Sequence, residues 1–169
     1  GLPDFRDHMR SATGQTLRVP TMAERLEGDC IAFSNVSPGA AYFLDPEHHG
    51  WVYHRAGCFG PGGKPITGDD ALAVASDADG DAAMVERFCG DVLAERAPKL
   101  AICWQCSPDK AGHSAPLLGP EHLAAMAAAD RHVGQVVATV ERLRASGDEV
   151  LLLVGSDHGM ESIGPRVHV

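Results

Sequence analysis

Two pairs of acidic and imidazole side chains have the residue types and spacing that metal-dependent chemistry needs. Asp109 and His113 are four positions apart, and Asp157 and His158 are adjacent within the stretch LLLVGSDHGM. Carboxylate oxygens and imidazole nitrogens are normal ligands of Zn²⁺. Bound divalent cations can activate a nucleophile and stabilise negative charge that develops during a reaction. The second pair, taken alone, could also be a polar turn after a core strand.

The elements expected to position these pairs are two strands. Residues 99–105 (KLAICWQ) and 149–154 (EVLLLV) are apolar runs typical of buried strands, and each ends shortly before one pair. In parallel α/β sheets, sites form at the carboxyl ends of the strands. We therefore expect the four side chains to converge if the two strands are neighbours. Asp157 and His158 can serve one site only where the chain turns, and the flanking glycines permit that.

The rest of the chain predicts alternating strands and helices. Apolar runs predict further strands at residues 30–35, 40–44 and 51–55. Helical periodicity predicts helices at residues 21–26, 81–96 and 121–145. Five glycines and two prolines within residues 57–70 predict a loop. The expected fold class is therefore α/β, a mostly parallel sheet flanked by helices, and residues 1–169 are expected to form a single domain.

Charge and hydropathy argue against two kinds of partner. The chain has 23 acidic and 14 basic residues and a formal charge of -9, which argues against binding to nucleic-acid polymers or anionic membranes. No apolar run reaches the ~20 residues of a membrane span, and no signal peptide is recognisable. The five cysteines form no disulfide framework, so a cytoplasmic location is expected. The sequence does not begin with Met, so processing or truncation could have removed one.

Four stretches carry a resemblance to a known group of enzymes. They are GSDHGM, DKAGH, the helix AADRHVGQVVATVERL and the earlier VPTMAERLEG. Together they resemble the alkaline phosphatase superfamily, and within it the type I phosphodiesterase/nucleotide pyrophosphatase branch, which includes phosphonoacetate hydrolase-like enzymes. The resemblance runs from about residue 19 onward.

This resemblance implies a fold, an activity and a ligand set. The fold would be an incomplete alkaline phosphatase-like core. The activity would be metal-dependent hydrolysis of phosphodiester, nucleotide pyrophosphate or phosphonate bonds in a small-molecule substrate. Two divalent metal ions are implied, with zinc expected. Asp109 and His113 would ligate one ion, and Asp157 and His158 the other.

The same resemblance requires groups that the chain does not supply at matching positions. A Thr or Ser nucleophile and a further Asp are expected upstream, and another His downstream. Neither Thr13 nor Thr21 occupies the position of the nucleophile, and His168 is expected to open the next strand. The chain is therefore expected to be the middle part of a longer catalytic domain that lacks its nucleophile. The alternative is a non-catalytic fragment or relative that keeps the fold and a partial metal site.

A histidine-rich segment offers a second, weaker set of candidates. The stretch DPEHHGWVYHR at residues 45–55 gathers three histidines and an arginine near aromatic residues. A surface loop and an edge strand explain it most simply. His54 and Arg55 remain candidate substrate contacts, because arginine suits phosphate and carboxylate groups.

Two further motifs have structural explanations. CWQC at residues 103–106 has the spacing of redox motifs, but Cys103 falls within a predicted strand, which favours small core residues. DADGD at residues 77–81 resembles half of a calcium loop, yet the glycine and glutamate expected later in such a loop are absent. Helix capping by Asp79 or Asp81 is the expected role.

Overall fold

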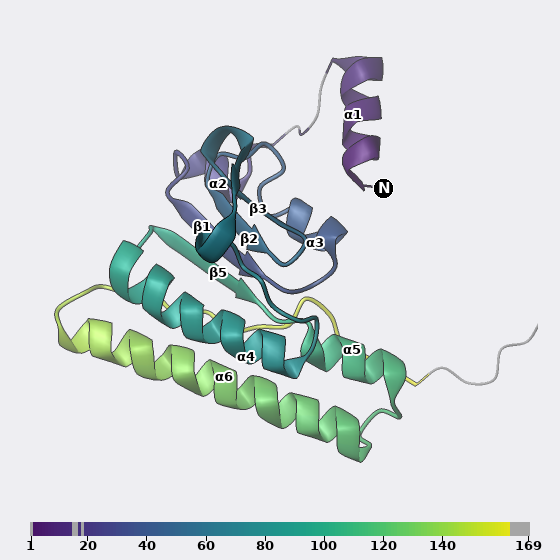
Figure 1. The fold of residues 1–169 in the computed structure, drawn as a ribbon, viewed down its shortest axis with the longest axis vertical. Helices are drawn as coiled ribbons and strands as arrows, with labels where there is room; N and C mark the ends of the chain where they lie inside the picture. The colour runs from purple at the N-terminus through teal and green to yellow at the C-terminus, as the bar shows by residue number, and fades with distance from the viewer. Residues whose placement is uncertain (1, 15–16, 18, 163–169) are drawn as a thin grey trace, which may run out of the picture. The chain divides into compact units, whose positions relative to one another are not determined.

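A mixed five-stranded sheet forms the centre of residues 1–106 in the computed structural model (Figure 1). The strand order is β4-β3-β2-β1-β5. β1 (Cys30–Ser34) is parallel to both of its neighbours, β2 (Trp51–His54) and β5 (Leu100–Trp104). β3 (Gly57–Gly60) and β4 (Lys64–Ile66) extend the sheet beyond β2 as antiparallel strands. The α/β prediction is confirmed, with three adjacent parallel strands as its core.

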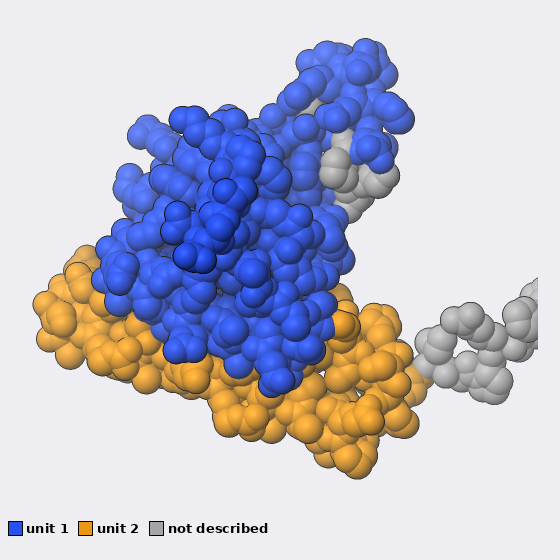
Figure 2. All heavy atoms as spheres, viewed as in Figure 1, with its two compact units in different colours: residues 1–106 blue, residues 107–169 orange. Residues whose placement is uncertain are grey.

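The structure describes residues 2–14, 17 and 19–162. The chain divides into two compact units, residues 1–106 and residues 107–169, which Figure 2 colours separately. The strand expected around His168 lies outside the described residues. That residues 1–169 form a single domain stays a prediction.

β1 is the most buried strand because both faces of the sheet are covered around it. All five of its residues are buried, as expected for a continuous apolar run in a parallel sheet. On one face, the Phe33 ring stacks on Tyr53 at 4.5 Å and meets Phe88 edge-on at 6.2 Å. Val52 alternates with Tyr53 along β2 and therefore points to the opposite face.

The described helices of this unit are α1 (Leu2–Thr13), α2 (Met22–Arg25), α3 (Pro38–Tyr42), α4 (Ala78–Arg87) and the π-helix η3 (Phe88–Arg96), with 3-10 turns η1 (Pro61–Gly63) and η2 (Gly68–Asp70). Polar side chains cap the first turns of α2, α3 and α4. The Thr21 hydroxyl accepts the Glu24 N–H, and the Asp77 carboxylate accepts the Gly80 N–H at 2.9 Å. The predicted cap at Asp79 or Asp81 is therefore wrong by position, because Asp77 is the cap.

Two helices and an irregular tail make up the described part of the second unit. α5 (Ser107–Ser114) packs against α6 (Pro120–Ala145), and residues 148–162 form no helix or strand. The predicted strand at residues 149–154 is therefore wrong. Leu151 and Leu153 are 81% and 82% exposed. A strand needs a neighbour for its backbone hydrogen bonds, and this unit has only helices in its described residues.

Other differences from the predicted elements have local causes. Residues 40–44 were expected as a strand, but the Ser37 cap and Pro38 start helix α3 there. The expected loop at residues 57–70 contains β3, which begins and ends with glycine, and β4, which has three residues including a proline, so neither shows a strand pattern. The predicted helix at residues 81–96 forms as α4 and η3. None of the described helices is long and apolar enough to cross a membrane.

Candidate functional site

Helix α5 presents the first acid–imidazole pair on one side. Asp109 and His113 are one turn apart, so their side chains share a helix face. The distance from Asp109 Oδ1 to His113 Nε2 is 3.4 Å. The sequence predicted this pair, but it placed the residues in a loop rather than on a helix.

The irregular tail brings the second pair to the same carboxylate. His158 Nε2 lies 3.6 Å from Asp109 Oδ1 and 3.7 Å from Asp157 Oδ2. His158 Nδ1 lies 3.0 Å from the Gly159 carbonyl, which can only accept, so Nδ1 carries the proton. In the neutral ring Nε2 then keeps its lone pair and is free to bind a cation.

A close contact between Gly112 and Met160 holds the tail against α5. A Cβ at Gly112 would lie only 2.1 Å from the Met160 sulfur, so the absence of a side chain at Gly112 makes room for Met160. Gly112 precedes His113, and Met160 follows His158 by two residues. This contact therefore helps to place the two pairs side by side.

Within each pair of side chains, the ligand atoms are spaced suitably for binding one cation. Asp109 Oδ1 is buried and has no hydrogen-bond partner among the residues the structure describes. Separations of 3.4 to 3.7 Å are longer than ordinary hydrogen bonds. They are near the ~3.3 Å between two ligands of one tetrahedral Zn²⁺ with bonds of about 2.0–2.1 Å.

The four side chains together do not surround a single position where a metal ion could bind. Within the described part of the chain, no group of three or more His, Cys, Asp or Glu side chains is arranged to hold a metal ion. The side chains are also accessible, from 46% exposed for Asp109 to 73% for His113. The structure thus shows converging pairs, and a bound cation would have to draw them together.

The second set of candidates, His54 and Arg55, follows strand β2 in the first unit. The Ala56 N–H donates to His54 Nδ1, so the neutral ring carries its proton on Nε2, which donates to the Val36 carbonyl at 2.9 Å. Burial lowers the pKa of His54, and the neighbouring Arg55 lowers it further, against the opposing effect of the Val36 hydrogen bond. His54 is therefore neutral and fully engaged with the backbone.

Arg55 uses only part of its hydrogen-bonding capacity. Its Nη1 donates to the carbonyls of Asn35 and Val36, close to the carboxyl end of β1. Its Nε and Nη2 atoms have no hydrogen-bond partner within the described residues. Of the two predicted substrate contacts, Arg55 has donors left to offer and His54 does not.

A buried polar network, which the sequence did not reveal, lies at the ends of the parallel strands. Asp81 is fully buried and accepts hydrogen bonds from the Cys106 N–H at 3.1 Å and from the Asn35 amide at 3.0 Å. Asn35 Nδ2 also donates to the Ala75 carbonyl at 2.8 Å. The acid in DADGD thus ties helix α4 to the strand ends. The polar residue closing the run CIAFSN was the available signal.

The CWQC motif shows no redox character. All five cysteines are free, and Cys103 lies within strand β5 as predicted. Burial of its thiol raises the pKa of Cys103 to about 12, although part of the residue remains accessible. A thiol with so high a pKa forms little thiolate, which is the reactive species. The structural explanation of these cysteines is therefore favoured.

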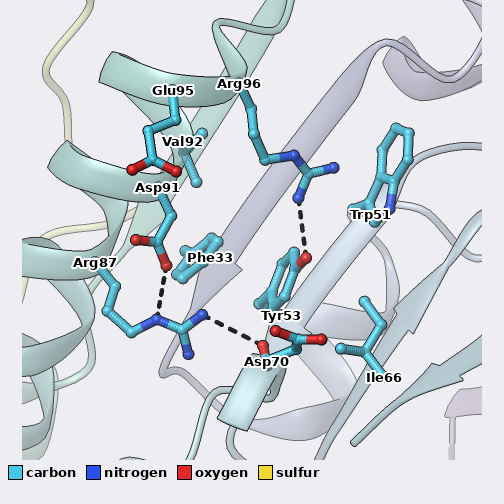
Figure 3. A pocket seen from close by; sticks show the side chains of 10 residues that line it. All are labelled: Phe33, Trp51, Tyr53, Ile66, Asp70, Arg87, Asp91, Val92, Glu95 and Arg96. Carbon is cyan, nitrogen blue, oxygen red and sulfur yellow. Dashed lines mark hydrogen bonds and ion pairs between the residues drawn. The ribbon is translucent and has the colours of Figure 1, made fainter.

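A cavity of about 360 Å³ lies between the sheet and η3 (Figure 3). Arg96 extends over the Trp51 ring at 4.5 Å and donates to the Tyr53 hydroxyl at 2.9 Å. Arg87 donates to Asp91 at 2.9 Å and to the Ala71 carbonyl. Both arginines thus have protein partners, and the acidic residues Asp70 and Glu95 also line this cavity.

The first unit thus contains an α/β sheet, and the second unit contains the cluster of carboxylates and imidazoles. Residues 39–169 match the family described as type I phosphodiesterase / nucleotide pyrophosphatase. This match covers most of the chain, so the chain belongs to that family, and the family indicates a hydrolase of this type. Comparison with curated proteins and with solved structures finds no match.

Proposed function

We propose that this chain carries the metal ligands of a hydrolase that cleaves phosphodiester, nucleotide pyrophosphate or phosphonate bonds in small molecules. The observation that carries the proposal is Asp109 Oδ1, which is buried, lacks a hydrogen-bond partner in the described residues and faces two imidazole nitrogens. A buried acceptor without a partner is costly, and a cation would remove that cost. Family membership supports the same chemistry.

The four side chains would divide between two divalent ions, with zinc as the expected metal. Asp109 and His113 would hold one, and Asp157 and His158 the other. Such ions stabilise the charge of the reacting phosphoryl group and of an attacking oxygen. The contribution of this chain is to present two imidazoles and two carboxylates close together, with His158 Nε2 unprotonated in the neutral ring. No Thr or Ser of the described residues is assigned as nucleophile.

Arg55 is the proposed substrate contact, through its free Nε and Nη2 donors. A planar guanidinium can bind a phosphoryl or carboxylate group with two parallel hydrogen bonds. His54 was predicted with it, and its ring supports the site by bonding to the Val36 carbonyl. We expect a reducing, cytoplasmic location, because none of the five cysteines forms a disulfide.

The test begins with zinc binding, measured by competition with a chromophoric chelator. Asp109→Asn, His113→Ala, Asp157→Asn and His158→Ala should each weaken binding, whereas the exposed controls Asp148→Asn and His8→Ala should not. Failure of the wild-type chain to bind zinc, or wild-type binding by all four ligand variants, would exclude this ligand set.

Hydrolysis of bis(4-nitrophenyl) phosphate and of phosphonoacetate then separates the two candidate functions. Turnover of the intact enzyme, with the nucleophile supplied, that falls by several orders of magnitude in Asp157→Asn or His158→Ala supports the hydrolase. Zinc binding by the intact protein without turnover of any of these substrates supports the alternative, a non-catalytic fragment or relative with a partial metal site. Release of phosphate from phosphonoacetate alone would assign the phosphonate branch.

A further inference from the structure

A second cavity, of about 150 Å³, lies on the opposite face of the sheet from the one in Figure 3. Its walls come from α3, the loop at residues 45–50, β2 and β3, all within the first unit. Val52 and Phe59 make much of its surface apolar. A cavity of this volume matches the engineered ~150 Å³ protein cavity that accepts benzene. It is therefore large enough for a ligand of five or six non-hydrogen atoms.

Asp45 gives this cavity an uncompensated acidic group. The residue is 3% exposed and lines the cavity. Its Oδ2 accepts the Gly50 N–H at 2.7 Å, but its Oδ1 is buried with no hydrogen-bond partner among the described residues. No Lys, Arg or His in the described chain forms an ion pair with it. A buried carboxylate with one hydrogen bond is expensive unless something else compensates it.

Tyr42 adds a second unsatisfied oxygen to the same lining. Its hydroxyl is buried and has no hydrogen-bond partner in the part of the chain that is described. His54 also lines the cavity, but both of its ring nitrogens are bonded to the backbone. Asp45 and Tyr42 are therefore the buried polar groups through which this cavity can recognise a ligand.

We propose that this cavity binds a small primary ammonium ion with a compact apolar body. The ammonium group has several N–H donors and a positive charge, which match the carboxylate of Asp45 and the hydroxyl of Tyr42. The Phe59 ring, which also lines the cavity, favours a cation nearby. The apolar walls fit an alkyl group of four carbons. A water molecule would satisfy one oxygen but would not offset the charge, and the apolar walls give it few partners.

Two further contacts show that this wall is built as part of the fold. The Arg6 guanidinium lies over the Tyr42 ring at 5.2 Å, on the side of the helices α1 and α3. Burial raises the pKa of the Cys30 thiol to about 11, and the negative charge of Asp45 adds to that effect. The Asp45 carboxylate is thus held near the core at the start of β1, away from bulk water.

The experiment is a titration of the full chain with isobutylammonium chloride, followed by NMR chemical shifts or calorimetry, at constant ionic strength. Saturable binding in the millimolar range is expected, and isobutanol, the neutral analogue, should bind at least ~10-fold more weakly because it lacks the charge. Asp45→Asn should weaken isobutylammonium binding by about 10- to 100-fold, and Tyr42→Phe by about threefold. The exposed variant Asp148→Asn is the charge-matched control.

Three results would overturn the proposal: no saturation up to ~100 mM, equal affinity for isobutanol, or competition by potassium ions as strong as by the ammonium. Should Asp45→Asn not fold, the comparison of isobutylammonium with isobutanol on the wild-type chain and on Tyr42→Phe decides the question alone. Zinc binding is measured in parallel. It concerns other residues, so its loss or retention leaves this proposal unaffected.

Discussion

Two polar clusters of this molecule contrast in how their groups are satisfied. In the first unit, the fully buried Asp81 accepts hydrogen bonds of 3.0 to 3.2 Å from Asn35 and from the Cys106 backbone. In the second unit, Asp109 Oδ1 is buried but meets two imidazole nitrogens only at 3.4 and 3.6 Å. The first cluster is complete with protein groups alone. The second has carboxylate and imidazole groups suited to binding a metal ion, but no hydrogen bonds join them.

This contrast distinguishes a carboxylate that stabilises the fold from a carboxylate that binds a metal ion. A buried acid that ties elements together should matter to the free energy of unfolding and little to metal binding. A carboxylate left without hydrogen bonds near imidazoles should matter to metal binding and little to folding. Four substitutions test this difference, from the largest expected effect to the smallest.

Asp109→Asn should weaken zinc binding by about 1,000-fold, because it removes the charged member of the two ligands proposed for its ion. The free energy of unfolding without zinc should stay within about 0.5 kcal/mol of the wild type, since the side chain is 46% exposed. Chelator competition and urea denaturation measure the two quantities. A variant that unfolds easily yet binds zinc normally would reverse the assignment of roles.

Asp81→Ala should lower the free energy of unfolding by about 3 kcal/mol, because it leaves the Cys106 N–H and the Asn35 amide without their acceptor inside the core. Zinc affinity should not change. Urea denaturation checks the first expectation, with Asp148→Ala as an exposed acidic control. Equal stability of the two variants would show that the buried network contributes nothing.

His54→Gln should flatten the dependence of stability on pH. Burial lowers the pKa of His54 below its ordinary 6.5, so below that pH the unfolded chain binds more protons than the folded one. Stability of the wild type should therefore fall as the pH drops below 6.5, by at most ~1.4 kcal/mol per pH unit from this group. Urea midpoints of both proteins, measured over about pH 5 to 7.5, test this expectation. Parallel curves would refute a buried neutral histidine.

Gly112→Ala should have the smallest effect, a loss of zinc affinity of about threefold. The new methyl group would meet the Met160 sulfur at 2.1 Å, but that sulfur is near the end of a flexible side chain and can move. Met160→Ala removes the same contact, so in a double-mutant cycle the losses of zinc affinity from the two substitutions should not add. Lack of any coupling would mean that this contact does not position His158.

The sequence predicted the long, strongly patterned elements and missed the short ones. β1, β2, β5 and α6 follow from apolar runs and helical spacing that only one structure satisfies. Residues 40–44 read equally as strand or helix, and Ser37 and Pro38 decided for helix. Helix α5 was hidden by its proline and glycine, although these lie where a first turn and a close packing contact tolerate them.

For the candidate site, residue types were readable but the reason for their proximity was not. Spacing indicated that Asp109, His113, Asp157 and His158 belong together, and the distances bring them near one another. The expected cause, two neighbouring strand ends, is replaced by a helix face and the Met160 contact. Asp45 and Tyr42 could not be foreseen, because the loss of hydrogen-bond partners depends on packing around them, which no local pattern encodes.

The bare leucines at positions 151 and 153 have a practical consequence for handling this chain. They are more than four-fifths accessible in a run of five aliphatic residues (150–154) without charge or proline, which is the composition that promotes intermolecular β-stacking. Concentrated preparations should therefore aggregate through this aliphatic segment, and chaperones would recognise it. Low protein concentration or the substitution Leu151→Lys should prevent this aggregation during the spectroscopic titrations.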